Sequence, residues 1–492
     1  MSTPAIPPEV LRAAVAHLAP VIPLLTELGE AFAKGGHELA LVGGPVRDAF
    51  LARASGDLDF TTSAAPEETE RILHVWGDAT WDMGREFGTI GARRGETIVE
   101  VTTYRADAYD GRTRKPVVAF GDNLRDDLVR RDFTVNAMAL RLPDLELVDP
   151  HGGLLDLAAQ RLRTPSTPDV SFTDDPLRMM RAARFVAQLG LVPAPDVTAA
   201  MTESAATLDI VSAERIRDEL VKLVLGEDPV AGLRVLVGTG LADHVLPELP
   251  ALRLEVDEHH RHKDVYEHSL TVLQQAIDLE DAARTDGDAQ RDPQETSVPG
   301  PDLVLRLAAL LHDIGKPRTR RFEDGGGVSF HHHDVVGAKM TAKRLKALRF
   351  DKETTKQVAR LVELHLRFHG YRDGQWTDSA VRRYVTDAGP LLQRLHRLTR
   401  ADCTTRNQRK ANRLARAYDD LEERIERLLE QEELEAVRPE LDGNQIGEVL
   451  GIPPGPQIGQ AYRYLLQVRL DEGPIGTEAA TDRLRAWWAE RG

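Results

Sequence analysis

The 492-residue sequence predicts an α+β protein: a small N-terminal α/β head with a mixed β-sheet, followed by an all-helical remainder. Between about residues 36 and 165, short strand-like runs alternate with short helical patterns. Within this region, residues 88–93 and 97–105 have the pattern of two strands joined by a tight turn at Arg94-Gly95. From about residue 166 onward the apolar residues recur at helical spacing, which completes the α+β prediction.

The first strand of the head is expected to end in a glycine turn. Residues 38–42 predict a strand, and Gly43-Gly44 follows it directly. Pro45 then occupies a position suited to the first residue of a helix. Residues 56–62 predict the second strand.

The periodicity also predicts the domain organisation. One segment, from about 281 to 301, is rich in Asp, Gln, Gly, Pro and Thr and predicts a disordered insertion. The predicted parts are an N-terminal helical segment (1–35), the head (36–165), a helical neck (166–254), a helical body (255–405) and a helical tail (406–492).

The composition excludes several classes of protein. With 63 basic and 79 acidic residues the formal net charge is −16, so any nucleic-acid partner has to meet local basic patches. A single cysteine excludes a disulfide framework and fits a reducing compartment. No apolar stretch approaches the ~20 residues that span a bilayer, and the N-terminal residues lack the pattern of a secretory signal. We therefore expect a cytoplasmic location and no membrane partner.

Two carboxylates, Asp57 and Asp59, stand two residues apart on the second predicted strand. Such side chains project from one face of a strand, so this pair is placed to hold one or two divalent cations. Gly43-Gly44 offers backbone amides to a phosphate. Glu100, opposite in orientation to its apolar neighbours, is a candidate third carboxylate. These residues predict metal-dependent nucleotidyl transfer. The alternatives are a solvated Asp-x-Asp at a strand end and, for Glu100, an exposed strand residue.

Residues 42–48 together with 57–59 resemble the first motif of the class II tRNA nucleotidyltransferases and bacterial poly(A) polymerases. The chain departs from the family's pattern at position 174, the first residue of the nucleobase-recognition segment given below, where the family usually has Glu and this chain has Asp174. The resemblance implies a catalytic head that uses Mg²⁺, held by the Asp57–Asp59 pair, followed by helical neck, body and tail. Four further segments follow in the family's order and are similar to its ribose-recognition, hinge, nucleobase-recognition and neck motifs: residues 130–138, 149–156, 174–178 and 212–217.

The same resemblance implies a nucleotide-binding set. Arg131, Asp132 and Asn136 are expected to line the ribose and triphosphate. For Asp132 the alternative is the cap of a helix formed by the apolar run 133–140. The full expected set is Gly43, Gly44, Arg47, Arg131, Asp132, Asn136, Asp175, Arg178 and Arg181.

Asp175 and Arg178 predict base selection from their chemistry. They are three residues apart, which places them on one face of a predicted helix. A carboxylate only accepts hydrogen bonds and a guanidinium only donates them. Cytosine and adenine each present an amino donor beside a ring-nitrogen acceptor and match the pair, whereas guanine and uracil present a carbonyl to the carboxylate. The pair therefore predicts use of CTP and ATP without a template, with an ordinary intrahelical salt bridge as the alternative.

A second candidate site lies in the body, where six ligand-type residues resemble an HD metal-dependent phosphohydrolase domain. Imidazole and carboxylate ligands suit Ni²⁺ or Mn²⁺, or Mg²⁺ with fewer histidines, and Lys316 is expected to bind phosphate. Residues 331–333 are all histidine, and the following Gly337 favours the third as ligand. Members of the resembling family differ in whether this body hydrolyses a substrate, so its activity is left open. The expected ligands are His268, His312, Asp313, His333, His365 and Asp402.

The predicted function is template-independent addition or repair of the 3′-terminal CCA of tRNA. Resembling enzymes that add the final A carry a flexible loop where this chain has residues 104–127, which favours complete CCA addition. The alternatives are a poly(A) polymerase or partial CC- or A-adding enzyme, an HD phosphohydrolase with an inactive head, and a non-catalytic RNA-binding module. The tail is expected to bind RNA, although a solvated charged helix is the alternative there. Its candidate basic residues are Arg406, Arg409, Lys410, Arg413 and Arg416.

Overall fold

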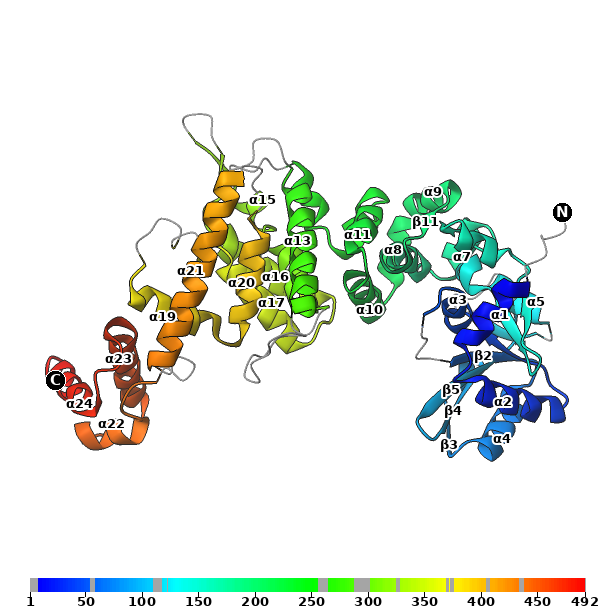
Figure 1. The fold of residues 1–492 in the computed structure, drawn as a ribbon, viewed down its shortest axis with the longest axis horizontal. Coiled ribbons are helices and arrows are strands. Elements are labelled where there is room, and N and C mark those ends of the chain that lie inside the picture. Colours follow the sequence, from blue (N-terminus) through cyan, green and yellow to red (C-terminus); the bar gives the residue numbers. More distant parts are fainter. Residues whose placement is uncertain are drawn as a thin grey trace. The chain divides into compact units, whose positions relative to one another are not determined.

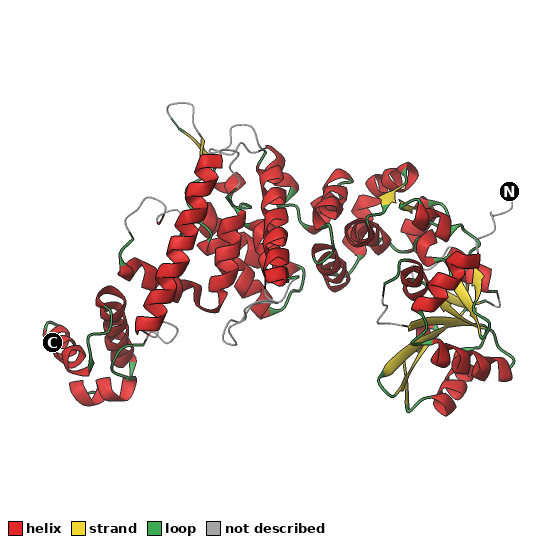
Figure 2. Cartoon of the chain, viewed as in Figure 1, coloured by secondary structure: helices red, strands yellow, loops and turns green. Residues whose placement is uncertain are grey.

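The chain folds into two compact units, Met1–His244 and Val245–Gly492 (Figure 1). Figure 2 shows that the large β-sheet belongs to the first unit and that the second unit is dominated by helices. The computed structural model describes residues 8–53, 58–108, 117–121, 123–254, 264–286, 301–323, 328–368, 371, 376–403, 408–432 and 438–491.

The head is built on a seven-stranded mixed sheet with the order β3-β4-β5-β2-β1-β8-β9. β2 and β5 pair in parallel, and the other five neighbouring pairs are antiparallel. This sheet and the helices that follow it confirm the predicted α+β class. The strands are β1 (Leu39–Val42), β2 (Leu58–Thr62), β3 (Ala79–Gly84), β4 (Thr89–Arg94), β5 (Thr97–Thr103), β8 (Ala139–Leu142) and β9 (Glu146–Val148), with a separate ribbon of β6 (Arg105–Ala108) and β7 (Val117–Phe120).

Apolar burial explains why the sheet is covered by helices. All four residues of β1 are buried, because β1 lies between β2 and β8 near the middle of the sheet. α2 packs on β1, β8 and α4, and its Leu25, Leu28 and Phe32 are fully buried. The helical segments of the head are α1 (Pro8–His17), α2 (Ile22–Lys34), α3 (Gly44–Phe50), α4 (Pro66–Trp76), η1 (Arg85–Phe87), α5 (Leu124–Val129), η2 (Thr134–Asn136) and α6 (Gly153–Ala158).

The apolar run 133–140 is not the helix that one alternative expected. It forms the short 3₁₀ turn η2 and then enters strand β8. β8 pairs with β1, with Ala139 opposite Val42 and Leu140 opposite Leu41. An apolar run of this length fits a buried strand as well as a helix, and the neighbouring strand decides between them.

The helices after the head pack around α8, whose Met179, Ala183 and Phe185 are buried. α8 contacts both α10 and α11. Gly232 of α11 allows close packing, since a Cβ there would lie 2.8 Å from the carbonyl oxygen of Ala183. These elements are β10 (Arg161–Leu162), α7 (Pro168–Asp174), α8 (Leu177–Leu189), β11 (Val192–Pro193), α9 (Pro195–Ser204), η3 (Ala205–Ile210), α10 (Ala213–Val224), α11 (Pro229–Gly238) and α12 (Leu241–Val245).

In its described residues, the second unit is a helical assembly with one small hairpin, β12–β13. Near its C-terminal end, α22, α23 and α24 enclose a core of their own that includes Ile446, Leu465 and Leu484. The elements are η4 (Pro250–Leu254), α13 (Val265–Asp286), α14 (Leu303–Leu311), α15 (Lys316–Thr319), β12 (Arg321–Phe322), β13 (Val328–Ser329), α16 (His333–Ala347), α17 (Lys352–Leu364), α19 (Asp378–Ala388), η5 (Gly389–Leu391), α20 (Leu392–Ala401), α21 (Gln408–Glu432), α22 (Gly443–Leu450), α23 (Pro456–Glu472) and α24 (Thr477–Ala489).

Part of the predicted disordered insertion is helical. α13 continues through Asp286, so residues 281–286 belong to this helix, and residues 287–300 lie outside the described residues. Among the described helices, none taken singly has the length and apolar composition to cross a membrane. The bent pair Glu9–His17 and Ile22–Lys34 meets that test only when its two helices are taken together.

Candidate functional site

The parallel pairing of β2 and β5 brings Asp59 and Glu100 side by side, since the two residues are register partners. Both are exposed, whereas the residues that flank them on their strands are buried. Carboxylate oxygens are ligands that suit Mg²⁺, so this pair of inner strands fits the predicted cation. Asp57, the other half of the predicted pair, lies outside the described residues.

Next to these carboxylates, Gly43 and Gly44 join β1 to α3. Gly43 has φ 73°, a left-handed conformation that favours glycine. A Cβ at Gly43 would lie 3.3 Å from Nη1 of Arg131. The bare backbone at this position therefore leaves room beside an arginine side chain.

Asp132 and Asn136 form a hydrogen-bonded pair on the ribose-recognition segment. Asn136 Nδ2 donates to Asp132 Oδ1 over 3.0 Å, and Arg181 Nε donates to Asp132 Oδ2 over 2.7 Å. Arg47 Nη1 donates to Asn136 Oδ1 over 2.8 Å, which orients the amide. Burial raises the pKa of Asp132, but Arg181 and the hydrogen bond from Asn136 outweigh burial and lower it to about 2. Asp132 is therefore held as a carboxylate.

Behind Arg181, the buried Glu219 of α10 faces two arginines of α8. Its carboxylate lies 3.8 Å from Arg181 Nη1 and 3.1 Å from Arg184 Nε. Burial lowers the pKa of Arg184 to about 10, and the charge of Arg181 acts in the same direction. The ion pairs between α8 and α10 thus hold the arginine that contacts Asp132.

Asp175 and Arg178 do not share one helix, which corrects the expectation. Asp175 has an extended backbone (φ −147°, ψ 101°) between α7 and α8, and only Arg178 lies within α8. Asp175 accepts hydrogen bonds from the backbone N–H of Leu177 and from Arg215 Nη2, at 3.1 and 2.8 Å. Pro176 follows Asp175 and disfavours the helical conformation there.

Arg178 makes its own contacts rather than a salt bridge with Asp175. Its guanidinium donates to Ser171 Oγ over 2.9 Å and to the carbonyl oxygen of Arg130 over 2.6 Å. Burial lowers the pKa of Arg178, with nearby carboxylates acting in the opposite direction. The alternative of an intrahelical Asp175–Arg178 salt bridge is therefore wrong.

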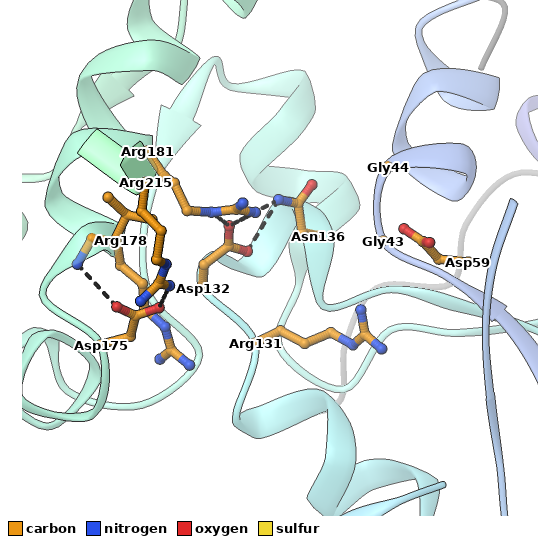
Figure 3. Close-up of a pocket in the computed structure, with 11 residues that line it drawn as sticks. Gly43, Gly44, Asp59, Arg131, Asp132, Asn136, Asp175, Arg178, Arg181 and Arg215 are labelled. Atoms are coloured by element: carbon orange, nitrogen blue, oxygen red, sulfur yellow. Dashed lines mark hydrogen bonds and ion pairs between the residues drawn. The ribbon is translucent and has the colours of Figure 1, made fainter. Parts of the chain in front are cut away.

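These residues surround one pocket of about 280 Å³ in the first unit. In Figure 3, Asp175, Arg178 and Arg215 gather at one end, Asp132, Asn136 and Arg181 lie in the middle, and Gly43, Gly44 and Asp59 lie at the other end. Arg47 and Glu100 belong to the predicted set but are not among the lining residues. The pocket is lined by Gly43, Gly44, Asp59, Arg131, Asp132, Asn136, Asp175, Leu177, Arg178, Arg181 and Arg215.

Sequence reasoning missed Leu177 and Arg215. Leu177 stands inside the nucleobase-recognition segment and is apolar, so nothing in its chemistry distinguished it. Arg215 lies within segment 212–217, which resembled the neck motif and received no role at the site. That resemblance was the signal that could have identified it.

The second unit contains a buried cluster of imidazoles and carboxylates. His268 Nε2 lies 3.0 Å from Asp402 Oδ1 and 3.3 Å from His312 Nε2. His312 Nε2 lies 3.2 Å from Asp313 Oδ2, and His333 Nε2 lies 3.3 Å from Asp313 Oδ1. All six predicted ligands are brought together, because His365 also lies in the group with Asp313 and His333.

The outward-facing ring nitrogens favour metal binding by this cluster. The Nδ1 atoms of His312, His333 and His365 lie 2.8, 2.8 and 2.6 Å from backbone carbonyl oxygens. In the neutral imidazole, donation from Nδ1 leaves Nε2 with a lone pair directed away from the backbone, which is the tautomer that metal-ligating histidines use. The Nε2 atoms of His333 and His365 are buried without a hydrogen-bond partner. Orphaned buried ligand atoms of this kind fit a divalent transition metal.

Lys316 adds positive charge beside the cluster. Its Nζ lies 2.9 Å from Asp313 Oδ2. Burial raises the pKa of Asp313, but His312 and Lys316 outweigh burial and hold it well below its usual range. His331 and His332 are exposed, in contrast to the buried His333.

The tail candidates are only partly described. Arg409, Arg413 and Arg416 are exposed on α21. Arg406 and the side chain of Lys410 lie outside the described residues, as do residues 109–116 and 122 of the predicted loop. The rest of that loop includes the β6–β7 ribbon and the start of α5.

Three parts of the chain match family models. Residues 39–163 match the poly A polymerase head domain. Residues 190–252 match the family described as "Probable RNA and SrmB- binding site of polymerase A". Residues 265–407 match the HD domain.

Among full-length relatives, the A-adding tRNA nucleotidyltransferase of Deinococcus radiodurans is 35% identical over 458 residues, which cover 92% of this chain and 95% of the relative. The CCA-adding enzyme of Bacillus velezensis is 40% identical over 220 residues, which cover 44% of this chain and about half (53%) of that relative.

Two solved structures share the fold. The CCA-adding enzyme of Bacillus stearothermophilus in complex with CTP aligns with a TM-score of 0.67 at 22% identity and covers 96% of this chain and 98% of that one. The Thermotoga maritima CCA-adding enzyme complexed with tRNA aligns with a TM-score of 0.57 at 18% identity and covers 97% of this chain and 98% of that one. These likenesses show the fold, and the match along the Deinococcus enzyme shows the family. The chain is a nucleotidyltransferase that belongs to the family of tRNA nucleotidyltransferases and bacterial poly(A) polymerases, with an HD domain in its second unit.

Proposed function

We propose that this enzyme adds or repairs the 3′-terminal CCA of tRNA, using CTP and ATP without a nucleic-acid template. The observation that supports this most directly is the arrangement of the pocket, with Asp175 and Arg178 at one end and Asp59 at the other. A nucleotide lying along this pocket has its base at the first end and its phosphates at the second.

Base selection rests on the polarity of Asp175 and Arg178. Arg178 donates three hydrogen bonds within the protein, to the carbonyl oxygen and Oγ of Ser171 and to the carbonyl oxygen of Arg130, and a guanidinium has five N–H groups. Asp175 offers carboxylate oxygens and no donor. Cytosine and adenine match that combination, and guanine and uracil bring a carbonyl against a carboxylate.

The other residues have roles that follow from their contacts. The Asp132–Asn136 pair accepts and donates toward the ribose, and Arg131 beside Gly43 adds positive charge for the phosphates. Asp57 and Asp59, with Glu100 adjacent, would hold Mg²⁺. When bound, Mg²⁺ lowers the pKa of the attacking hydroxyl and neutralises charge on the phosphates. The 3′-oxygen of the RNA bonds to the α-phosphorus as the bond to the β-phosphate oxygen breaks, pyrophosphate leaves, and the hydroxyl proton is lost to solvent.

The test is incorporation into tRNA transcripts that end before the CCA, after the first C, or after both C residues. With CTP and ATP together, CCA addition predicts completion of all three transcripts and no extension beyond the terminal A. Long tails with ATP alone would identify a poly(A) polymerase and contradict the proposal.

A second candidate is addition of the terminal A only. The relative that matches most of this chain carries the name A-adding tRNA nucleotidyltransferase. In that case ATP extends only the transcript that already ends in CC, and CTP is never incorporated. Failure of C addition would therefore replace the first proposal with this one.

We also propose that the HD cluster binds a divalent metal, Ni²⁺, Mn²⁺ or Mg²⁺, and hydrolyses a phosphoester. Two observations support this proposal: the Nε2 atoms of His333 and His365 are buried without a hydrogen-bond partner, and the buried Lys316 lies beside Asp313. A bound metal would activate the attacking water. Lys316 supplies a fixed positive charge for the phosphate that is released as the ester P–O bond breaks.

The test combines metal analysis of the purified protein with hydrolysis of p-nitrophenyl phosphate in the presence of each metal. Asp313→Ala is expected to lose both the metal and the hydrolysis. A protein without metal, or hydrolysis equal in wild type and variant, would contradict the proposed hydrolase role of the HD cluster.

The transferase proposal has its own test at the head. An Asp59→Ala variant with full incorporation activity would point to a different transferase site.

A further inference from the structure

Asp127 of α5 is a buried carboxylate outside the set of residues that lines the pocket. The backbone N–H of Arg105, the first residue of β6, donates to Asp127 Oδ1 over 3.3 Å. Thr61 Oγ1 on β2 lies 3.2 Å from Asp127 Oδ2 and 3.1 Å from the carbonyl oxygen of Thr102, so its hydroxyl proton is within reach of both oxygens. Two uncharged donors from other segments therefore fix the orientation of this carboxylate.

The third partner of Asp127 is Arg131, which does line the pocket. Arg131 Nη2 donates to Asp127 Oδ2 over 3.3 Å, and a Cβ at Gly43 would lie 3.3 Å from Nη1 of the same guanidinium. In Figure 3 the side chain of Arg131 extends toward the end of the pocket that holds Gly43 and Asp59. One nitrogen of the guanidinium thus binds Asp127 while another lies beside the glycine turn.

Thr61 connects Asp127 to the strand that carries the proposed cation ligands. It stands two residues beyond Asp59 on β2, and residues two apart on a strand project from the same face of the sheet. The position of Asp127 is therefore fixed relative to Asp59. A guanidinium bound to Asp127 is held near the same end of the pocket.

Holding Arg131 in this way prepares it for a phosphate. An arginine side chain has several rotatable bonds, and a ligand that binds it must otherwise restrict them. The side chain of Asp127 is 8% exposed and that of Arg131 is 26% exposed, so water competes only weakly with their contact. A buried ion pair contributes little net stability when the cost of removing both charges from water is counted. The contact is better explained by the preorganisation of a charged group for the reaction.

We propose that Asp127 is a positioning residue that holds the guanidinium of Arg131 toward the triphosphate of the incoming nucleotide. The inference rests on the proposed function, in which Arg131 supplies positive charge for the phosphates. Asp127 acts through Arg131 and does not itself touch the nucleotide. Thr61 and the backbone of Arg105 support the carboxylate in this role.

The test is the addition of A, from ATP, to a tRNA transcript that ends in CC, which both CCA addition and addition of the terminal A alone predict. In Asp127→Asn, kcat/KM for ATP is expected to fall about tenfold because Arg131 loses its charged partner, while KM for the tRNA stays within about twofold of wild type. Asp126→Asn neutralises the neighbouring exposed carboxylate and is the matched control with an unchanged kcat/KM. An unchanged kcat/KM in Asp127→Asn would overturn the inference.

Competition by two fragments of the substrate separates positioning from general support of the pocket. Pyrophosphate carries phosphates without a nucleoside, and adenosine is a nucleoside without phosphates. In Asp127→Asn the inhibition constant of pyrophosphate is expected to rise about tenfold and that of adenosine to stay within about twofold of wild type. Equal rises in both constants would overturn the positioning role. If Asp127→Asn does not fold, Thr61→Val takes its place, with an expected rise of about threefold for pyrophosphate alone and with an unchanged constant as the contrary result.

A double-mutant comparison tests whether the effect passes through Arg131. Arg131→Ala is expected to raise the inhibition constant of pyrophosphate, and adding Asp127→Asn to it should change that constant by less than about twofold. A full additional rise would show that Asp127 acts independently and would overturn the inference. If Arg131→Ala leaves the constant unchanged, the phosphate role of Arg131 fails and the inference fails with it.

Failure of the proposed function gives a different result. In that case wild type extends no transcript, and calorimetric titration of pyrophosphate into the full chain tests the inference without the reaction. Weaker binding by Asp127→Asn than by wild type supports the positioning role. Equal binding overturns it.

Discussion

Arg181 of α8 donates to the carboxylate of Asp132 over 2.7 Å, although 49 residues separate them. The contact links a helix that follows the head to the ribose-recognition segment within it. Arg181 is in turn held near the buried Glu219. The middle of the pocket thus depends on a long-range ion pair, and this dependence has a measurable consequence.

The ion pair predicts a pH-dependent contribution to stability. The pKa of Asp132 is lowered to about 2, so this group stabilises the fold fully above its ordinary pKa near 4. The contribution is lost as pH falls from about 4 to about 2, and its size is about 2 kcal/mol. Urea unfolding midpoints of wild type and Asp132→Asn should therefore converge as pH falls through this window. Midpoints that stay parallel between pH 5 and 2 would contradict the assignment.

Asp59→Ala is expected to reduce nucleotide incorporation more than about a thousandfold, because a cation ligand at the reacting phosphate is lost. The residue is exposed, so the thermal midpoint should change little. Asp144→Ala removes another exposed carboxylate of the head and is the matched control. Incorporation that survives in the first variant would remove Asp59 from the reaction.

Asp175→Asn is expected to relax base selection. The asparagine amide presents a donor where the carboxylate only accepts, so guanine and uracil carbonyls gain a partner. Incorporation of GTP or UTP relative to CTP should rise by about tenfold or more, as measured by single-nucleotide extension of a tRNA transcript. If selectivity stays unchanged, another group reads the base.

Arg215→Ala tests the residue that sequence reasoning missed. Arg215 is 54% exposed in its ion pair with Asp175, so its loss should change stability by less than about 1 kcal/mol. We expect a several-fold higher KM for CTP and ATP, because Asp175 loses the contact that orients it, and partial recovery in Arg215→Lys. A large loss of stability with unchanged KM would show that the residue only supports the fold.

His365→Ala is expected to lower the bound metal of the HD cluster, since its buried Nε2 has no protein partner. Metal content after dialysis, measured by plasma mass spectrometry, is the readout. His74→Ala, at an exposed position of the head, should leave the metal content as in wild type. Equal metal in wild type and His365→Ala would exclude this histidine as a ligand.

Local sequence patterns were sufficient to predict much of the structure of the head. The two-residue period of a strand predicted that Glu100 faces away from its apolar neighbours, and the structure adds its pairing with Asp59. At residues 133–140 the alternative drawn from such a pattern is wrong, because an apolar run that fits a helix instead forms a turn and a strand. Pairing with β1 supplied the difference, and a partner strand is invisible to a local pattern.

The candidate site shows the same difference between what local sequence patterns predict and what tertiary contacts decide. Residue types and short spacings in the chain were enough to identify the carboxylates, the glycine turn and the histidines, because their chemistry and their motifs are local properties. The tertiary structure determined which charged side chains form ion pairs. Arg215 binds Asp175 across 40 residues and Arg181 binds Asp132 across 49, and such contacts arise when packed helices bring distant segments together. Spacing along a helix suggested an Asp175–Arg178 pair instead, and the break at Pro176 removed the helix on which that expectation depended.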